Sequence, residues 1–196
     1  MQALTPAAAA IELRGIDKSF GSVHAVRGVS LRIEPGTITG IVGENGAGKS
    51  TLMKLLSGAI QPTTGEIRLE GRPIRFSGTR QASAAGIVCM FQELSLLPTL
   101  SVGDNITLAR PQTRFGFMLA KAYEDARAAL DLIGAESISL DTPVEELSLA
   151  DRQRVEIAKA LYQKPRLLIL DEATSALGAS AVEKVFTVIR KLRDEG

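Results

Sequence analysis

Hydrophobic and polar residues alternate in two segments near the start of the chain, at 11–16 and 29–33. Alternation with a period of two is typical of half-buried strands, and the second segment ends at a Pro-Gly turn signal. Two further short segments, 66–70 and 73–76, flank a glycine and predict a hairpin. Together these segments predict a small antiparallel sheet in the first part of the chain.

Continuous apolar runs predict buried strands at 37–42, 87–91 and 166–171. Between and after these runs, apolar residues recur every three or four positions, which is typical of helices. The expected helices cover 49–56, 78–86, 119–133, 147–163 and 179–193. Because strands alternate with helices, the pattern favours an α/β fold with a mainly parallel sheet.

The stretch 94–146 differs from its surroundings, since proline and glycine interrupt it and helical spacing dominates its second half. We expect a mostly helical insertion between two strands of the parallel sheet. Residues 1–10 are rich in alanine but lack the basic residues and long apolar core of a signal peptide. They are expected to form a flexible lead-in.

Composition narrows the class of protein. The chain has 196 residues, of which 45% are hydrophobic and 23% charged, as in ordinary soluble globular domains. A net charge of +1 gives no reason to expect nucleic acid as a partner. Since no apolar run reaches about 18 residues, we expect no membrane-spanning helix. The single cysteine, Cys89, excludes an intramolecular disulfide.

A glycine-rich segment follows the apolar run 37–42 and fits the phosphate-loop pattern G-x-x-x-x-G-K-[ST] at every specified position. Its glycines allow positive φ and close approach of phosphate oxygens. Lys49 supplies a cation for the β- and γ-phosphates, and the Ser50 hydroxyl can join the coordination sphere of Mg²⁺. The alternative is a turn that binds no ligand. The residues predicted to hold the nucleotide phosphates are Gly43, Glu44, Asn45, Gly46, Ala47, Gly48, Lys49, Ser50 and Thr51.

A second motif closes the apolar run 166–171, which ends in Asp171 and continues with Glu172. An aspartate at the carboxyl end of a buried strand can hold Mg²⁺ through water. Glu172 can polarise the water that attacks the γ-phosphate. The alternative is a solvated turn. With the phosphate loop, this motif predicts a P-loop nucleotide hydrolase.

Three further segments resemble the ATP-binding cassette (ABC) ATPases. Residues 147–154 are similar to the family's signature segment, 91–93 to its Q-loop and 175–177 to its D-loop. Residues 43–54 and 91–98 look most like the ATPases of simple-sugar importers of the ribose and galactose type, in which two cassettes are often fused. The resemblance implies a lead-in at 1–10 and one nucleotide-binding domain at 11–196, with a P-loop core, an N-terminal antiparallel β subdomain and the helical insertion.

The resemblance also implies roles for single residues. Phe20 would stack on adenine, unless it is a core residue. Gln92 would contact Mg²⁺ and the attacking water, unless it is a plain surface residue. Ser148 would face the γ-phosphate of an ATP held by a partner cassette in a head-to-tail dimer. Ser148 is also a good helix N-cap, with Asp151 placed as in a capping box.

Three features depart from the family's pattern. Leu, Ala and Asp at 149–151 stand where the signature usually reads Gly-Gly-Gln, and they would crowd and repel a partner's phosphate. Gly178 stands where the D-loop usually carries Asp. The family's switch histidine is expected beyond Gly196, since His24 precedes the phosphate loop and is interpreted as a surface or turn residue. We therefore expect a partial cassette.

The function that the resemblance implies is an ATP-binding subunit that couples Mg-ATP binding and hydrolysis to sugar import. Lys49, Gln92 and Glu172 would be catalytic, and Ser50, Gln92 and Asp171 would hold the metal. The partners would be transmembrane permease subunits, a second cassette and, indirectly, a sugar-binding protein, with this chain peripheral on the cytoplasmic face of the membrane. Two alternatives remain: a nucleotide-gated interaction module with little hydrolysis, and a soluble ABC ATPase not tied to transport.

Overall fold

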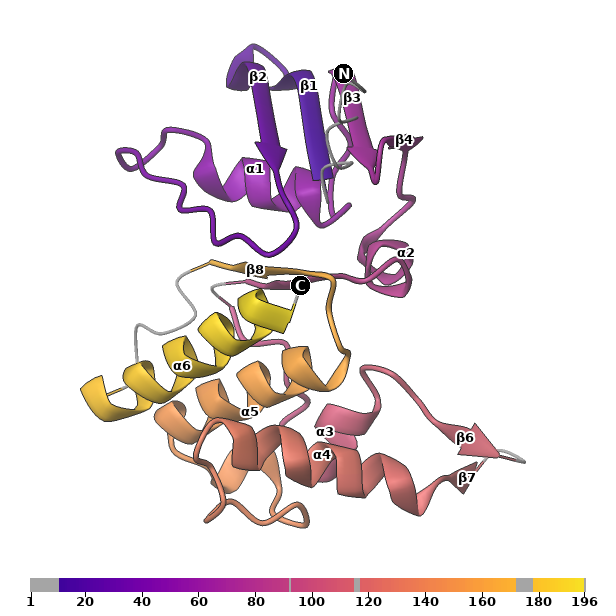
Figure 1. Cartoon of the computed structure of the whole chain (residues 1–196), viewed down its shortest axis with the longest axis vertical. Helices are drawn as coiled ribbons and strands as arrows, with labels where there is room; N and C mark the ends of the chain where they lie inside the picture. Colours follow the sequence, from indigo (N-terminus) through magenta and orange to yellow (C-terminus); the bar gives the residue numbers. More distant parts are fainter. Residues whose placement is uncertain (1–10, 92, 115–116, 172–177, 196) are drawn as a thin grey trace, which may run out of the picture. The chain divides into compact units, whose positions relative to one another are not determined.

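The computed structural model describes residues 11–91, 93–114, 117–171 and 178–195 (Figure 1). The expected lead-in at 1–10 lies outside the described residues. The chain divides into two compact units, one formed by residues 1–85 with 192–196 and the other by residues 86–191.

The first unit contains a four-stranded sheet with the order β2-β1-β3-β4, in which every neighbouring pair is antiparallel. Its strands are β1 (Ile11–Phe20), β2 (Val23–Ile33), β3 (Thr64–Leu69) and β4 (Arg72–Ile74). Ile11 and Leu13 of β1 are buried, as a period of two predicts, and Ile16 is also buried because a register shift between Leu13 and Ile16 brings it to the same face. Both the antiparallel sheet and the hairpin formed by β3 and β4 are confirmed.

Two helices accompany this sheet, α1 (Lys49–Leu56) and α2 (Thr79–Ala84). In Figure 1, α1 lies beside the strands, and its buried residues are Leu52, Leu55 and Leu56. The spacing of these three residues places them on one face of the helix. The predicted helices at 49–56 and 78–86 are therefore confirmed.

The prediction of a buried strand at 37–42 is wrong in this structure. Within the described part of the first unit, the sheet pairs only β1 to β4, and residues 37–42 belong to no strand. Ile38 is 56% and Val42 97% exposed. A strand needs a hydrogen-bonded neighbour, and an apolar run alone does not provide one.

The second unit combines a parallel strand pair with helices. β5 (Ile87–Met90) pairs with β8 (Leu167–Leu170), from Ile87 opposite Leu167 to Met90 opposite Leu170. These strands confirm the strands predicted at 87–91 and 166–171, although in β8 only Ile169 is buried and the other residues are half-buried. The helices are α3 (Val102–Thr107), α4 (Ala120–Leu132), the 3₁₀ helix η1 (Val144–Glu146), α5 (Leu149–Tyr162) and α6 (Ala179–Glu195).

The segment 94–146 contains α3, α4 and η1, so a mostly helical stretch is confirmed. It also contains a short antiparallel hairpin of β6 (Thr113–Arg114) and β7 (Phe117–Met118), which the sequence did not predict. Strands of two residues are too short to show a period of two.

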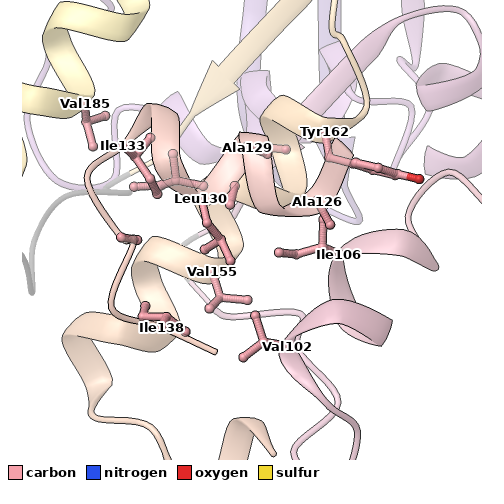
Figure 2. Packing of buried hydrophobic residues seen from close by; sticks show 14 of the residues in the cluster. Val102, Ile106, Ala126, Ala129, Leu130, Ile133, Ile138, Val155, Tyr162 and Val185 are labelled. Carbon is pink, nitrogen blue, oxygen red and sulfur yellow. The ribbon is translucent and has the colours of Figure 1, made fainter. Parts of the chain in front are cut away.

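An apolar core holds the helices of the second unit together. Figure 2 shows side chains of α3, α4 and α5 converging on one cluster, among them Ile106, Leu130 and Val155. These three side chains are completely buried. α6 adds Val185 and Val188 to the same cluster, with Ile189 packed against it, while Phe186 is exposed.

A capping box closes the start of α3. The Ser101 Oγ accepts a hydrogen bond from the Asp104 N–H at 3.0 Å and donates to Asp104 Oδ2 at 2.7 Å. The hydroxyl of Tyr123 in α4 donates to Asp104 Oδ1 at 2.7 Å. The Tyr123 hydroxyl, and next the Ser101 hydroxyl, lower the pKa of Asp104 below its usual value.

We expect Tyr123→Phe to lower the free energy of unfolding by about 1.5 kcal/mol at neutral pH, since it removes a hydrogen bond to an ionised carboxylate. A carboxylate with a lowered folded-state pKa contributes stability above its unfolded pKa and loses it as the pH falls through the folded value. The difference in the free energy of unfolding between the unchanged protein and Tyr123→Phe should therefore narrow below about pH 4. Urea unfolding at pH 7 and pH 3 measures it. An equal gap at both values would contradict the assignment.

Candidate nucleotide-binding site

The phosphate loop runs from Gly43 into the first turn of α1. Gly46 and Gly48 have φ values of 85° and 87°, a left-handed conformation that glycine adopts readily. Gly48 is the N-cap of α1, and a Cβ at this position would overlap the carbonyl oxygen of Ala25 in β2. The Ala47 N–H donates to the Glu44 carbonyl at 3.1 Å and closes the loop into a tight turn. The loop sequence is therefore required both by backbone conformation and by close packing.

Lys49 lies across this loop. Its Nζ donates to the carbonyl oxygens of Gly43 at 2.7 Å and Glu44 at 2.8 Å. These bonds use two of the three ammonium donors and hold the cation at the loop. The first turn of α1 contains no acidic residue, and no side chain caps it. Its N–H groups and the ammonium therefore favour an anion at the same place.

Ser50 and Thr51 follow Lys49 in the first turn of α1. Ser50 is exposed and Thr51 is half-buried. An exposed hydroxyl beside the loop is suited to a metal ion held together with a phosphate. The role of Ser50 as a metal ligand stays a prediction.

Phe20 ends β1, and its side chain is 50% exposed. The alternative that Phe20 belongs to the core is therefore wrong, while its stacking on adenine stays a prediction. The Lys18 ammonium lies 5.0 Å from the centre of the ring, which is a cation–π distance. His24 is exposed and its Nδ1 is 3.0 Å from the Ser19 hydroxyl, which confirms a surface histidine.

The other predicted site residues belong to the second unit. Asp171 directly follows β8, where its N–H donates to the Met90 carbonyl at 3.0 Å and extends the ladder with β5. Its side chain is half-buried. Gln92, Glu172 and the segment 175–177 lie outside the described residues, so their roles stay predictions.

Ser148 is the N-cap of α5, which confirms the predicted N-cap, while the Asp151 carboxylate contacts the Ser148 hydroxyl and so forms a variant of the capping box. Its Oγ accepts from the Asp151 N–H at 3.1 Å, and its hydroxyl donates to Asp151 Oδ2 at 2.7 Å. The residue that follows, Leu149, is 63% exposed. The predicted signature segment therefore has an ordered start on an exposed helix end.

A polar network that the sequence did not reveal joins α5 to the segment before α3, with the buried Glu156 at its centre. The Ser95 hydroxyl donates to Glu156 Oε1 at 2.6 Å, and Lys159 Nζ donates to the Ser95 carbonyl at 3.0 Å. Lys159 also lies 3.8 Å from Glu156, and burial lowers the pKa of the Lys159 ammonium. The available hint was a pair of opposite charges, three residues apart, on an amphipathic helix.

Three features define a P-loop nucleotide-binding protein. They are a glycine-rich loop with left-handed residues, a lysine bonded to the carbonyl oxygens of that loop, and a helix start without a side-chain cap. Residues 26–175 match the sequence model of the family described as ABC transporter. The chain therefore belongs to the ABC transporter family, as an ATP-binding cassette. Among the described residues, no helix has both the length and the apolar character needed to cross a bilayer.

Curated relatives are similar over nearly the whole chain. The ribose import ATP-binding protein RbsA 1 of Rhizobium etli is 51% identical over 185 residues, which are 94% of this chain and 36% of the relative. The protein of the same name from Streptomyces coelicolor is 47% identical over 193 residues, 98% of this chain and 38% of the relative. The chain thus spans little more than a third of the length of these relatives.

Solved structures share the fold. The dimeric structure of a bacterial ABC transporter cassette has a TM-score of 0.83 at 26% identity, covering 94% of this chain and 83% of the other. A nucleotide-free ATP-binding cassette also has a TM-score of 0.83, at 24% identity, covering 96% of this chain and 78% of the other. The predicted P-loop fold is confirmed.

Proposed function

We propose that this chain is the nucleotide-binding part of an ATP-binding subunit that drives the import of a sugar through a membrane permease. The observation that carries the proposal is the anion site formed by the Lys49 ammonium, the Gly43 to Gly48 loop and the uncapped start of α1. The relatives named ribose import ATP-binding proteins support a sugar as the substrate class.

The residues present fit a magnesium–triphosphate complex. The loop and α1 supply hydrogen-bond donors without a competing carboxylate in the first turn, and the exposed Ser50 hydroxyl supplies an oxygen ligand. Asp171 and Gln92 would complete the metal site. Held by these residues, a magnesium ion would supply neutralisation of part of the phosphate charge.

Each protein group would then have a separate task. Lys49 would hold the β- and γ-phosphates in place, and Phe20 would orient the base by stacking. Glu172 would orient and polarise the attacking water. Catalysis would come mostly from positioning and from charge stabilisation, because phosphoryl transfer requires little covalent chemistry from the protein.

The proposal includes the assembly in which the site works. Both units would form one cassette at 11–196, peripheral to the cytoplasmic face of the membrane, with the insertion at 94–146 contacting the permease. A second cassette would pair head-to-tail with it, so that Ser148 faces the partner's γ-phosphate. The dimeric form of a related cassette supports such pairing.

The experiment that tests hydrolysis is Glu172→Gln. We expect phosphate release to fall at least 100-fold, within the range for loss of a general base, while ATP binding remains. Steady-state phosphate release and nucleotide binding are measured on the same preparations. Glu183→Gln, at an exposed position of α6, is the matched control and should change neither quantity.

Unchanged phosphate release in Glu172→Gln would reject the hydrolase and favour the nucleotide-gated interaction module. The third possibility, a soluble ABC ATPase, is tested by adding membranes that contain the permease. Only a transport-coupled subunit should sediment with those membranes and change its rate of hydrolysis.

A further inference from the structure

The hydroxyl proton of Ser148 is used by its own helix. Its oxygen accepts from the Asp151 N–H at 3.1 Å, and its proton is donated to Asp151 Oδ2 at 2.7 Å. A serine hydroxyl has one donor, and an ionised carboxylate can only accept. The one proton that Ser148 can offer is therefore directed at Asp151.

The Asp151 carboxylate is itself held in place. Its Oδ1 lies 3.2 Å from Arg154 Nη1, one turn further along α5. The Nε of Arg154 is buried and makes no hydrogen bond within the described residues. Arg152 fixes the preceding segment by donating to the carbonyl oxygens of Val144 and Leu147, each at 3.1 Å. The serine, the carboxylate and the helix start thus form one ordered unit.

A second copy of this box, at the start of α3, shows what a purely structural version looks like. There Ser101 and Asp104 make the same two hydrogen bonds, and Tyr123 takes the place of Arg154. The residue after Ser101 is Val102, which is 0% exposed, whereas the residue after Ser148 is Leu149, which is 63% exposed. The α3 box lies against protein, and the α5 box is open to solvent.

Resting on the proposed function, we propose that Asp151 is a positioning residue that holds the Ser148 hydroxyl and thereby restrains ATP-dependent pairing with a second cassette. Phosphate oxygens accept hydrogen bonds, so a partner's γ-phosphate has to replace the Asp151 carboxylate as the acceptor of the Ser148 proton. The carboxylate also repels the anion. The restraint acts on pairing and leaves binding of ATP to the chain's own phosphate loop unchanged.

Asp151→Asn tests this role. An asparagine has the shape of an aspartate without its charge. Its amide can donate to Ser148 Oγ, which frees the hydroxyl proton. The backbone N–H of residue 151 still caps the helix through Ser148 Oγ. We expect ATP-dependent association to tighten roughly tenfold, as for one gained hydrogen bond to a charged group. Sedimentation with Mg-ATP, in a Glu172→Gln background that slows turnover, gives the association constant. Thermal unfolding checks that the variant is folded.

Two controls separate the proposed role from a structural one. Ser148→Ala added to Asp151→Asn should cancel the gain in association, because the freed hydroxyl is then absent. Asp104→Asn in the α3 box should lower thermal stability without tightening association. A gain that persists without Ser148, or no gain at all, overturns the proposal.

The same experiment distinguishes failure of the proposed function. Binding of a fluorescent ATP analogue at dilute protein concentration reports the chain's own phosphate loop. If the analogue binds and association is unchanged by Asp151→Asn, the inference is wrong and the nucleotide site stands. If the analogue does not bind, both the inference about Asp151 and the proposed function are wrong.

Discussion

Replacement of Lys49 by alanine is expected to lower ATP affinity by roughly 100-fold, since hydrogen bonds to charged groups contribute about 1.5–3 kcal/mol and the ammonium also neutralises phosphate charge. The Lys49 Nζ is already held at the loop by the carbonyl oxygens of Gly43 and Glu44. Little rearrangement is then needed to meet an anion. Titration of ATP by calorimetry measures the loss.

The matched control for this change is Lys54→Ala. Lys54 lies in the last turn of the same helix and is exposed, away from the loop. Lys54→Ala should bind ATP with an affinity within about twofold of that of the unchanged protein, because exposed charges are screened by salt. Equal effects of the two substitutions would mean that the phosphates bind elsewhere.

Replacement of Lys159 by methionine is expected to lower the free energy of unfolding by about 3 kcal/mol, the lower end of the range for breaking a buried ion pair. Glu156 is only 6% exposed, and its Oε2 has no hydrogen-bond partner among the described residues. Without Lys159, the Ser95 hydroxyl would be the one remaining partner of this carboxylate in the part of the chain that the structure describes. Denaturant unfolding at neutral pH gives the change.

Two further variants test the explanation. Lys159→Met combined with Glu156→Gln should recover part of the loss, because no buried charge is then left unpaired. Lys121→Met removes a pair with Asp125 in which the lysine side chain is 69% exposed, and should cost about 0.5 kcal/mol or less. If Lys121→Met proved as harmful as Lys159→Met, burial would not be the cause.

Local patterns were enough to predict the helices whose first residue follows a strong sequence signal. The phosphate-loop motif fixes the start of α1 at Lys49, and Ser148 fixes the start of α5 through a cap that depends on neighbouring residues alone. The strands β5 and β8 were also predicted, because both are short apolar runs, whereas their pairing with each other is a long-range feature. The chemistry of the loop followed from residue types at fixed spacing.

Features that depend on contacts between residues far apart in the chain could not be predicted from the sequence. Ser95 and Glu156 are 61 positions apart, and nothing local to either one reveals their hydrogen bond. The failure at 37–42 has the same origin, since strand formation depends on a partner and the apolar run shows only a preference for burial. The capping hydrogen bond of Ser148 was predicted, whereas the capture of its proton by Asp151 required atomic positions.

The close approach of Gly48 to Ala25 joins the phosphate loop to the hairpin of β1 and β2. Ala25 belongs to β2, and β2 is paired with β1 from Ile11 opposite Ile33 to Phe20 opposite Val23. The exposed ring of Phe20 and the turn at Gly48 are therefore attached to the same hairpin. Any side chain at position 48 would press on the strand that is paired with the Phe20 strand, so one hairpin constrains both positions.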